Sequence, residues 1–340
     1  MSSNQDSSPD DHSVLTFLEP DSEPDSDSAS ILSSTKSCNE SIYNYIKENG
    51  RTYHSYCAGS YPYPNDDPEL ERQDLQYEIL KVLFGGRNFF APLDNPKDIL
   101  DIGCGTGKWA IEMGCYFPNS RVTGIDLTPC QPVDDLPRNV RFIIDDANQE
   151  DWLVRADYIH ARMLIGAFED FREVIRKAYD HLDPGGWFEC QEIMNSLFCD
   201  DSTMTQDNPF LEWTRTQHQA AMNLGRPVRI ANKLRKWLED AGFVDVHEEI
   251  FKLPINPWPK DPQFKMLGRF HEACLLDGIQ AFSLAFFTRG MSWSKEEVEV
   301  YLVNVRKAIS DRNVHAYHKI YVVWGRKPEN ARANPIPSRS

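Results

Sequence analysis

The amino-acid sequence predicts an α/β fold in which a mainly parallel sheet is covered by helices on both faces. Strand-like and helix-like hydrophobic patterns alternate along residues 98–251, and this alternation is typical of parallel sheets built from β-α-β units. A glycine-rich turn joins the first of these strands to the first of these helices. The 340 residues, of which 41% are hydrophobic, are enough to bury a large core.

Each predicted strand is a short apolar run that ends in turn-forming or polar residues. The strands are predicted at 98–102, 121–125, 140–144, 156–160 and 186–193, with two more around 243–251 and 318–325. Apolar residues at helical spacing predict helices over about 108–117, 171–182 and 228–241. A helical stretch over 264–287 and a capped helix from Ser294 onward are also expected.

The rest of the chain divides into segments of different composition. Residues 1–40 contain nine acidic residues and twelve serines, which predicts a disordered tail. Residues 41–90 are rich in tyrosine and predict an N-terminal lid followed by a helix. We further expect a core over 91–253, a helical substrate-side insertion over 254–312, the last strand within 313–328 and a disordered tail at 329–340.

Charge and composition argue against several classes of function. The chain has 36 Lys and Arg residues against 52 Asp and Glu, a net charge of −16, which disfavours direct binding of nucleic acid. No apolar run is long enough for a membrane span and no signal peptide is recognisable, so we expect a cytoplasmic or nuclear protein that is not secreted. The eight scattered cysteines lack CxxC pairs, and we therefore expect no metal site.

The glycine-rich turn has the pattern DxGxGxG at residues 101–107. Glycines at these positions let the backbone turn sharply and approach a ligand closely. The dinucleotide fingerprint GxGxxG needs a glycine where this chain has Lys108. The spacing therefore argues against NAD or FAD.

Carboxylates stand at the ends of three successive predicted strands. Asp101, beside the glycine turn, suits an ammonium group and would repel a pyrophosphate. Asp126 ends the second strand, where this architecture binds a ribose diol. The third strand ends before Asp146 and Ala147, which can read an adenine edge. A ribose, an adenine and an ammonium without a phosphate occur together in S-adenosyl-L-methionine, which is the predicted cofactor.

These segments resemble the successive motifs of class I S-adenosylmethionine-dependent methyltransferases over about residues 95–195. The resemblance implies a seven-stranded Rossmann-like sheet. It places Asp101, Gly103, Gly105 and Gly107 at the methionine end of the cofactor, Asp126 at the ribose, and Asp146 with Ala147 at the adenine. Leu127, next to Asp126, belongs to the same cofactor-binding set.

Further segments, at 50–54, 63–66, 72–76, 255–259 and 321–328, resemble the fungal LaeA-like methyltransferases, and this match spans about 45–328. The resemblance implies that Tyr53 and His54 belong to a lid over the cofactor that excludes water. The alternative is that the tyrosines of this segment simply pack on the sheet edge.

His160 and Arg162 end the fourth predicted strand, at the edge that faces the sulfonium in this fold. A histidine can take the proton when the methyl acceptor is a hydroxyl or an ammonium. We therefore consider His160 a candidate base or orienting group, and Arg162 a contact to substrate or cofactor. The alternative is that His160 only caps its strand. Aromatic residues of 254–290 suit either an apolar acceptor pocket or the core: Trp258, Phe264, Phe270, Phe282, Phe286 and Phe287.

Two functions remain open at this point. The first is an enzyme that methylates an O, N or C atom of a small-molecule acceptor in fungal secondary metabolism. The second, implied by the LaeA-like resemblance, is a nuclear regulator of secondary metabolism that works with a velvet-type protein partner. A cofactor-binding protein without activity is a third alternative.

Overall fold

The computed structural model describes residues 43–59, 61–152 and 154–331. The tail predicted at 1–40 and most of the tail predicted at 329–340 lie outside these residues. The described strands are β1 (Ile46–Glu48), β2 (Arg51–Tyr53), β3 (Asp98–Ile102), β4 (Arg121–Asp126), β5 (Val140–Ile144), β6 (Ala156–Arg162), β7 (Leu182–Ile193), β8 (Val244–Pro254) and β9 (Tyr317–Arg326). The described helices are α2 (Asp67–Leu83), α3 (Lys108–Tyr116), α4 (Phe171–His181), α5 (Pro209–Asn223), α6 (Leu234–Asp240), α7 (Pro262–Gly278), α8 (Leu284–Met291) and α9 (Lys295–Ile309).

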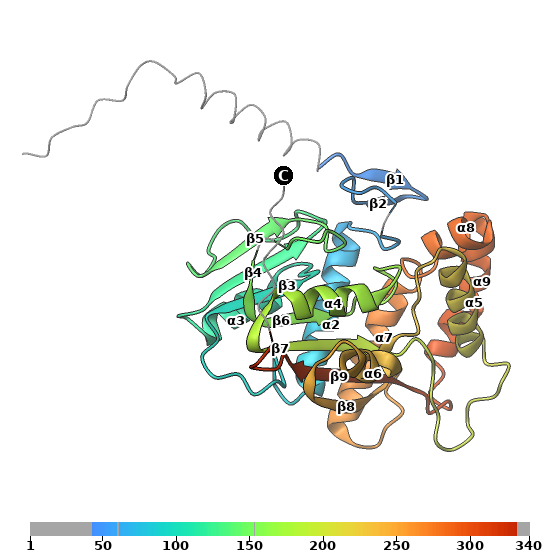
Figure 1. Ribbon diagram of the computed structural model, residues 1–340. Helices are drawn as coiled ribbons and strands as arrows, with labels where there is room; N and C mark the ends of the chain where they lie inside the picture. Colours follow the sequence, from blue (N-terminus) through green and yellow to red (C-terminus); the bar gives the residue numbers. More distant parts are fainter. Residues whose placement is uncertain (1–42, 60, 153, 332–340) are drawn as a thin grey trace, which may run out of the picture. The chain divides into compact units, whose positions relative to one another are not determined.

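Seven strands form one sheet in the order β5-β4-β3-β6-β7-β9-β8 (Figure 1). β9 pairs antiparallel with both of its neighbours, and the other ladders of this sheet are parallel. The chain runs outward from β3 to β4 and β5 and then returns to β6 on the other side of β3. This reversal puts the topological switch point of the sheet between β3 and β6, where ligands bind in open α/β sheets.

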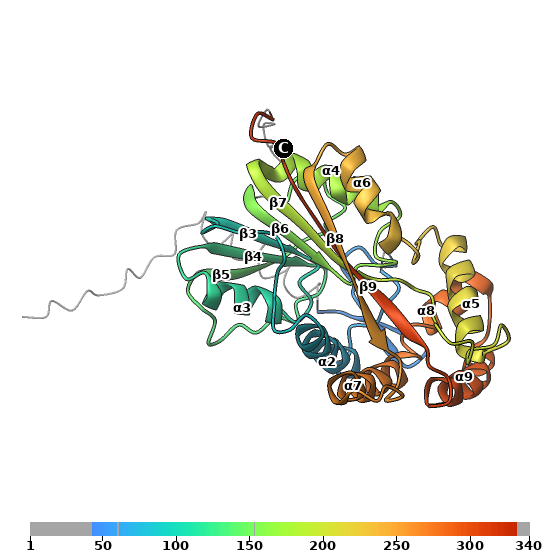
Figure 2. The same cartoon turned by 90° about the horizontal axis from the view of Figure 1, so that it is seen from below.

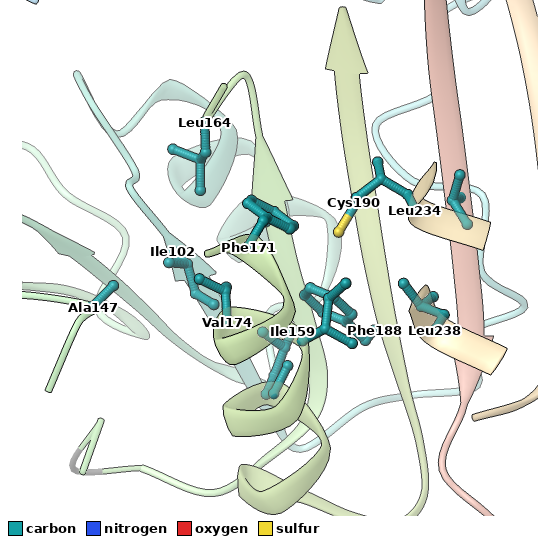
Figure 3. Packing of buried hydrophobic residues seen from close by; sticks show 14 of the residues in the cluster. Ile102, Ala147, Ile159, Leu164, Phe171, Val174, Phe188, Cys190, Leu234 and Leu238 are labelled. Atoms are coloured by element: carbon teal, nitrogen blue, oxygen red, sulfur yellow. The ribbon is translucent and has the colours of Figure 1, made fainter. Parts of the chain in front are cut away.

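Helices cover both faces of the sheet, as the sequence predicts (Figure 2). On one face, α4 and α6 bury apolar side chains against the strands. Figure 3 shows Phe171 and Val174 of α4 and Leu238 of α6 packed around Ile159 and Phe188 of the sheet. On the other face, α2, α3 and α7 pack in a second apolar cluster. The fold is the predicted Rossmann-like α/β class.

The last strand is separated from β8 by three helices, α7, α8 and α9, which lie in the segment predicted to be helical. With α5, the helices α8 and α9 form a third apolar cluster beside the sheet (Figure 2). The N-terminal part holds the β1–β2 hairpin and α2, which begins at the N-cap Asp66. No helix in the described part of the chain is long and apolar enough to cross a membrane.

Two predicted helices are wrong in extent. The helix expected over 228–241 is a short 3-10 turn at 231–233 followed by α6. The backbone just before it is bound to another segment, because the Pro227 carbonyl accepts a hydrogen bond from the Gly166 amide at 3.2 Å and so does not start a helix. The stretch expected over 264–287 is divided into α7 and α8. In the break, the Ser283 hydroxyl donates to the Ile279 carbonyl at 2.6 Å and accepts from the Trp213 indole at 2.8 Å.

Candidate functional site

A cavity opens at the carboxyl ends of β3, β4, β5 and β6, at the switch point of the sheet. Most of the residues predicted to bind cofactor or substrate line it: Asp101, Gly103, Gly105, Asp126, Leu127, Asp146, Ala147, His160 and Arg162. Gly107, Tyr53 and His54 are not among its lining residues. The geometry therefore brings together residues from four strands that are up to 61 positions apart in the sequence, from Asp101 to Arg162.

The glycine turn gives the cavity its backbone wall and starts helix α3. Gly107 is the N-cap of α3 and has a φ of 81°, which an L side chain rarely adopts. A Cβ atom at this position would lie 2.5 Å from the Phe142 ring on β5. Gly107 is thus needed for the shape of the turn, although its own atoms do not border the cavity.

Asp126 holds the glycine turn against the end of β4. Its carboxylate accepts from the Gly105 amide at 2.8 Å and from the Thr128 amide at 2.9 Å. Burial raises the pKa of Asp126 to about 6, although these backbone amides act in the opposite direction. The carboxylate has further lone pairs for a diol, since each oxygen can accept more than one hydrogen bond.

The end of β5 presents Asp146 and Ala147 to the cavity. One oxygen of Asp146 accepts from the backbone amide and the side-chain amide of Asn148, at 2.9 and 2.7 Å. The Ala147 carbonyl accepts from the Trp152 indole at 3.0 Å. These contacts fix the backbone at the position predicted for the adenine.

Asp101 and His160 face each other across the switch point. They are register partners on β3 and β6, and Nδ1 of His160 lies 2.8 Å from Oδ1 of Asp101. Burial raises the pKa of Asp101 to about 8 and lowers the pKa of His160 well below its usual value. Both shifts favour an uncharged pair that shares one proton. A cation placed beside Asp101 would favour its ionised form.

The N-terminal segment closes the cavity through Tyr61 and Tyr63 rather than through Tyr53 and His54. The Tyr63 hydroxyl donates to the Ile165 carbonyl at 3.2 Å, and its ring packs edge-on against Tyr61 at 5.2 Å. His54 is buried behind them, with its ring 6.0 Å from that of Tyr61. His54 therefore supports the wall of the cavity from outside, whereas Tyr53 is buried with the Arg289 guanidinium 5.0 Å from its ring centre.

Helix α2 supplies a polar wall that the sequence patterns do not reveal. Arg72 donates from Nε and Nη2 to the two oxygens of Glu69, at 3.0 and 2.7 Å, and both side chains are buried. Gln73, one residue further, donates to the same carboxylate at 3.3 Å. The 3.6-residue period of α2 places these residues on one face, but no signal in the sequence marks that face as buried.

The opposite wall is apolar and comes from the segment after β6 and from the end of β7. Its residues are Met163, Leu164, Ile165, Ala167, Phe168 and Ile193. The aromatic residues of 254–290 do not line this cavity, so of the two alternatives for them the acceptor pocket does not apply to the cavity described. Phe286 and Phe287 are buried in the helical cluster, whereas Phe264 and Phe270 are 41% and 47% exposed.

The sheet order, with one antiparallel strand next to the edge, and the cavity at the switch point define a Rossmann-like α/β fold with a ligand-binding site at its usual place. The family described as "Methyltransferase domain" matches residues 72–248. The chain belongs to this family and is an S-adenosylmethionine-dependent methyltransferase.

Several curated relatives are similar to this protein over most of its sequence. "Methyltransferase pytC" of Aspergillus terreus is 39% identical, with 93% of this chain and 99% of the relative covered. "Secondary metabolism regulator LAE1" of Cochliobolus heterostrophus is 36% identical, with 84% of this chain and 95% of the relative covered. "Protein-methionine methyltransferase laeA" of Emericella nidulans is 32% identical, with 84% of this chain and 77% of the relative covered.

Proposed function

We propose that the cavity binds S-adenosylmethionine with its methionine end at Asp101, its ribose at Asp126 and its adenine at Asp146 and Ala147. The observation that supports this orientation is the order of the three carboxylates along β3, β4 and β5 at one edge of the sheet. The buried Asp101 suits the ammonium of the cofactor, since a cation offsets the cost of ionising it. The bound cofactor supplies an activated methyl group on a sulfonium.

We propose that the acceptor is a small molecule with a mainly apolar body. Beyond the proposed cofactor residues, the same cavity continues between the apolar wall around Leu164 and the polar wall around Glu69 and Arg72. An apolar pocket with a few polar groups is typical of small-molecule sites. Tyr61 and Tyr63 close this part, and they would exclude water from the acceptor.

We propose that His160 orients Asp101 rather than removing a proton from the acceptor. Its Nδ1 is engaged by Asp101 and its ring is stacked on Trp109, at a centroid distance of 3.7 Å. Orientation alone contributes up to roughly 7–11 kcal/mol to an in-line displacement. An acceptor that needs no strong base, such as a thioether, a neutral amine or an ionised phenol, fits this arrangement.

The names of the relatives support a role in fungal secondary metabolism, either in biosynthesis or in regulation. We favour a biosynthetic enzyme, because pytC, which is named only as a methyltransferase, is 39% identical over 93% of this chain, against 36% over 84% for the regulator LAE1. The second candidate is a nuclear regulator that works in a velvet-type complex. It is supported by the relatives named as secondary metabolism regulators.

The experiment has two stages. Calorimetric titration of the purified protein with S-adenosylmethionine, S-adenosylhomocysteine and, as a control, NAD should show micromolar binding of the first two only. Mass spectrometry of a fungal metabolite extract incubated with protein and S-adenosylmethionine should then show a product heavier by one methyl group. Failure to bind the first two ligands would contradict the cofactor site. Methylation of a co-purified protein, with no modified metabolite, would favour the regulator.

A further inference from the structure

Arg162 is a cation at the cavity wall whose charge is not neutralised by a direct ion pair with any described residue. Its Nη2 donates to the Asn88 carbonyl at a long 3.4 Å, and its guanidinium lies 5.3 Å from the centre of the Tyr77 ring. Its Nε is buried and has no hydrogen-bond partner within the described ranges. A guanidinium offers five N–H donors, so most of the binding capacity of this side chain is unused.

The carboxylates of Asp101 and Glu189, which lie near Arg162, are already engaged by other groups. Asp101 is held by His160 at 2.8 Å. Glu189 accepts from the backbone amides of Phe90 and Ala91, at 2.8 and 2.9 Å, and from the Gln191 side chain at 2.7 Å. Both carboxylates act on Arg162 only through space. An unpaired buried charge is costly, which indicates that Arg162 is arranged for an anion that binds in the cavity.

Arg72 provides the contrast within the same cavity. It lines the wall opposite the sheet edge, and both oxygens of Glu69 satisfy its Nε and Nη2 donors. The charge of Arg72 is therefore paired with a carboxylate inside the cavity. Arg162 has no such partner among the residues that the structure describes, although its side chain borders the cavity.

The register of the sheet places Arg162 beside the proposed ammonium site. Asp101 is the partner of His160 across β3 and β6, and Arg162 lies two residues beyond His160, on the same face of β6. The cavity floor therefore presents a carboxyl and a guanidinium next to each other. This pairing is complementary to the ammonium and carboxylate of an α-amino acid, and a guanidinium binds a carboxylate through two parallel hydrogen bonds.

We propose that Arg162 binds the α-carboxylate of the methionyl end of the cofactor. This inference rests on the proposed cofactor orientation and assigns Arg162 to the cofactor rather than to the methyl acceptor. Asp101 binds the ammonium and Arg162 the carboxylate, so the two residues together favour a ligand that carries both groups of an amino acid. A nucleoside thioether that lacks the carboxylate loses the contribution of Arg162 while keeping the contacts of its adenosine.

The experiment compares two ligands that differ only in the carboxylate. Calorimetry with S-adenosylhomocysteine and with its decarboxylated analogue, 5′-(3-aminopropyl)thioadenosine, gives a ratio of dissociation constants for each protein. For the wild type we expect the analogue to bind about 10- to 150-fold more weakly, the range of one charge-assisted contact. For Arg162→Met we expect the ratio to fall to about one to three, because only S-adenosylhomocysteine loses affinity.

The control is Lys108→Met, which removes another cation from the cavity wall, one paired with Asp74 at 3.3 Å. Lys108→Met should change the affinity for both ligands by the same factor, so the ratio of their dissociation constants should stay at the wild-type value. If Arg162→Met does not fold, Arg162→Lys replaces it. Lysine keeps the positive charge but cannot form the two parallel hydrogen bonds of a guanidinium, so this variant must also lower the ratio. A wild-type ratio near one, or equal losses for both ligands in the Arg162 variants, would overturn the proposal. Absence of S-adenosylhomocysteine binding to the wild type would instead overturn the proposed cofactor site, and the Arg162 inference with it.

Discussion

The imidazole of His160 lies flat against the indole of Trp109, with ring centroids 3.7 Å apart and planes 8° from parallel. The indole is fixed in turn, because its N–H donates to the Asn88 carbonyl at 2.8 Å. The ring of His160 is thus held through its plane by Trp109 and through its edge by Asp101. Such a ring cannot turn toward an acceptor without losing both contacts.

We expect the His160→Asn variant to retain cofactor binding, because the asparagine amide can replace Nδ1 as the partner of Asp101. His160→Ala should weaken S-adenosylhomocysteine binding by roughly 10-fold, the lower end of the range for one hydrogen bond to a charged group. Calorimetry gives both affinities. Turnover of His160→Asn measured over pH 6–9 should follow the wild-type profile. If the rise of turnover with increasing pH disappears in His160→Asn, His160 would instead have the role of a base.

Asp126 gives a second test of the cofactor orientation. Asp126→Ala removes the partner of the Gly105 and Thr128 amides as well as the proposed ribose contact. We expect S-adenosylhomocysteine to bind about 10- to 150-fold more weakly, from a charge-assisted contact of roughly 1.5–3 kcal/mol. Asp134→Ala, at an exposed position after the same strand, is the control and should bind as the wild type does. An unchanged affinity in Asp126→Ala would mean that the ribose lies elsewhere.

Gly86, just after α2, and Gly107, in the glycine turn, separate two costs that a Cβ atom can bring. Gly86 has a φ of 84°, and a Cβ atom added to it would have nothing within 4 Å, so Gly86→Ala carries the backbone strain alone, about 1–2 kcal/mol of unfolding free energy. Gly107 has a similar φ of 81°, but its Cβ would lie 2.5 Å from Phe142. We therefore expect Gly107→Ala to cost about 1–3 kcal/mol more.

Urea unfolding of the two variants measures this difference in free energy, and calorimetry measures their affinity for S-adenosylhomocysteine. Only Gly107→Ala should bind it more weakly, because only that turn shapes the proposed cofactor site. Equal stability and equal affinity in the two variants would show that the Phe142 contact relaxes without cost.

The sheet could be predicted from the sequence because its strands are local patterns. The predicted strands 98–102 and 140–144 coincide with β3 and β5, since a buried parallel strand is a short apolar run with turn residues on both sides. The carboxylates at the ends of these strands could be located from the same local patterns. The order of the strands in the sheet comes from the structure alone. Helix α5 was not predicted, because polar residues such as Thr214 and Gln217 are buried on its inner face and interrupt the apolar stripe.

The walls of the cavity could not be predicted in the same way. A charged residue on a helix is normally read as solvent-exposed, yet Glu69 and Arg72 are only 2% and 6% exposed. Their burial depends on α2 lying across the cavity, which is a tertiary contact. Likewise, the aromatic composition of 43–63 indicated a half-buried segment but did not distinguish Tyr61, which lines the cavity, from Tyr53, which does not.

The buried histidine pair between α7 and β9 predicts how stability depends on pH. His271 and His318 have ring centroids 5.2 Å apart, and Nδ1 of His271 lies 2.9 Å from the Pro254 carbonyl. Burial lowers the pKa of His271 to about 4 and that of His318 well below its usual value. The unfolded chain takes up protons below pH 6.5, whereas the folded chain does not until about pH 4. Stability is therefore lost as the pH falls from about 6.5 to about 4.

The magnitude follows from the same linkage. At pH 5, His271 alone should cost about 2 kcal/mol of unfolding free energy relative to pH 7.5. His271→Asn keeps a donor for the Pro254 carbonyl, but its side chain has no proton to gain. The unfolding free energy of this variant should therefore fall by about 2 kcal/mol less between pH 7.5 and pH 5 than that of the wild type. Urea unfolding of both proteins at pH 7.5 and pH 5 measures the difference, with the pH 7.5 values as the baseline for the substitution itself. Parallel losses in wild type and variant would show that His271 stays uncharged in the unfolded chain or is charged in the folded one.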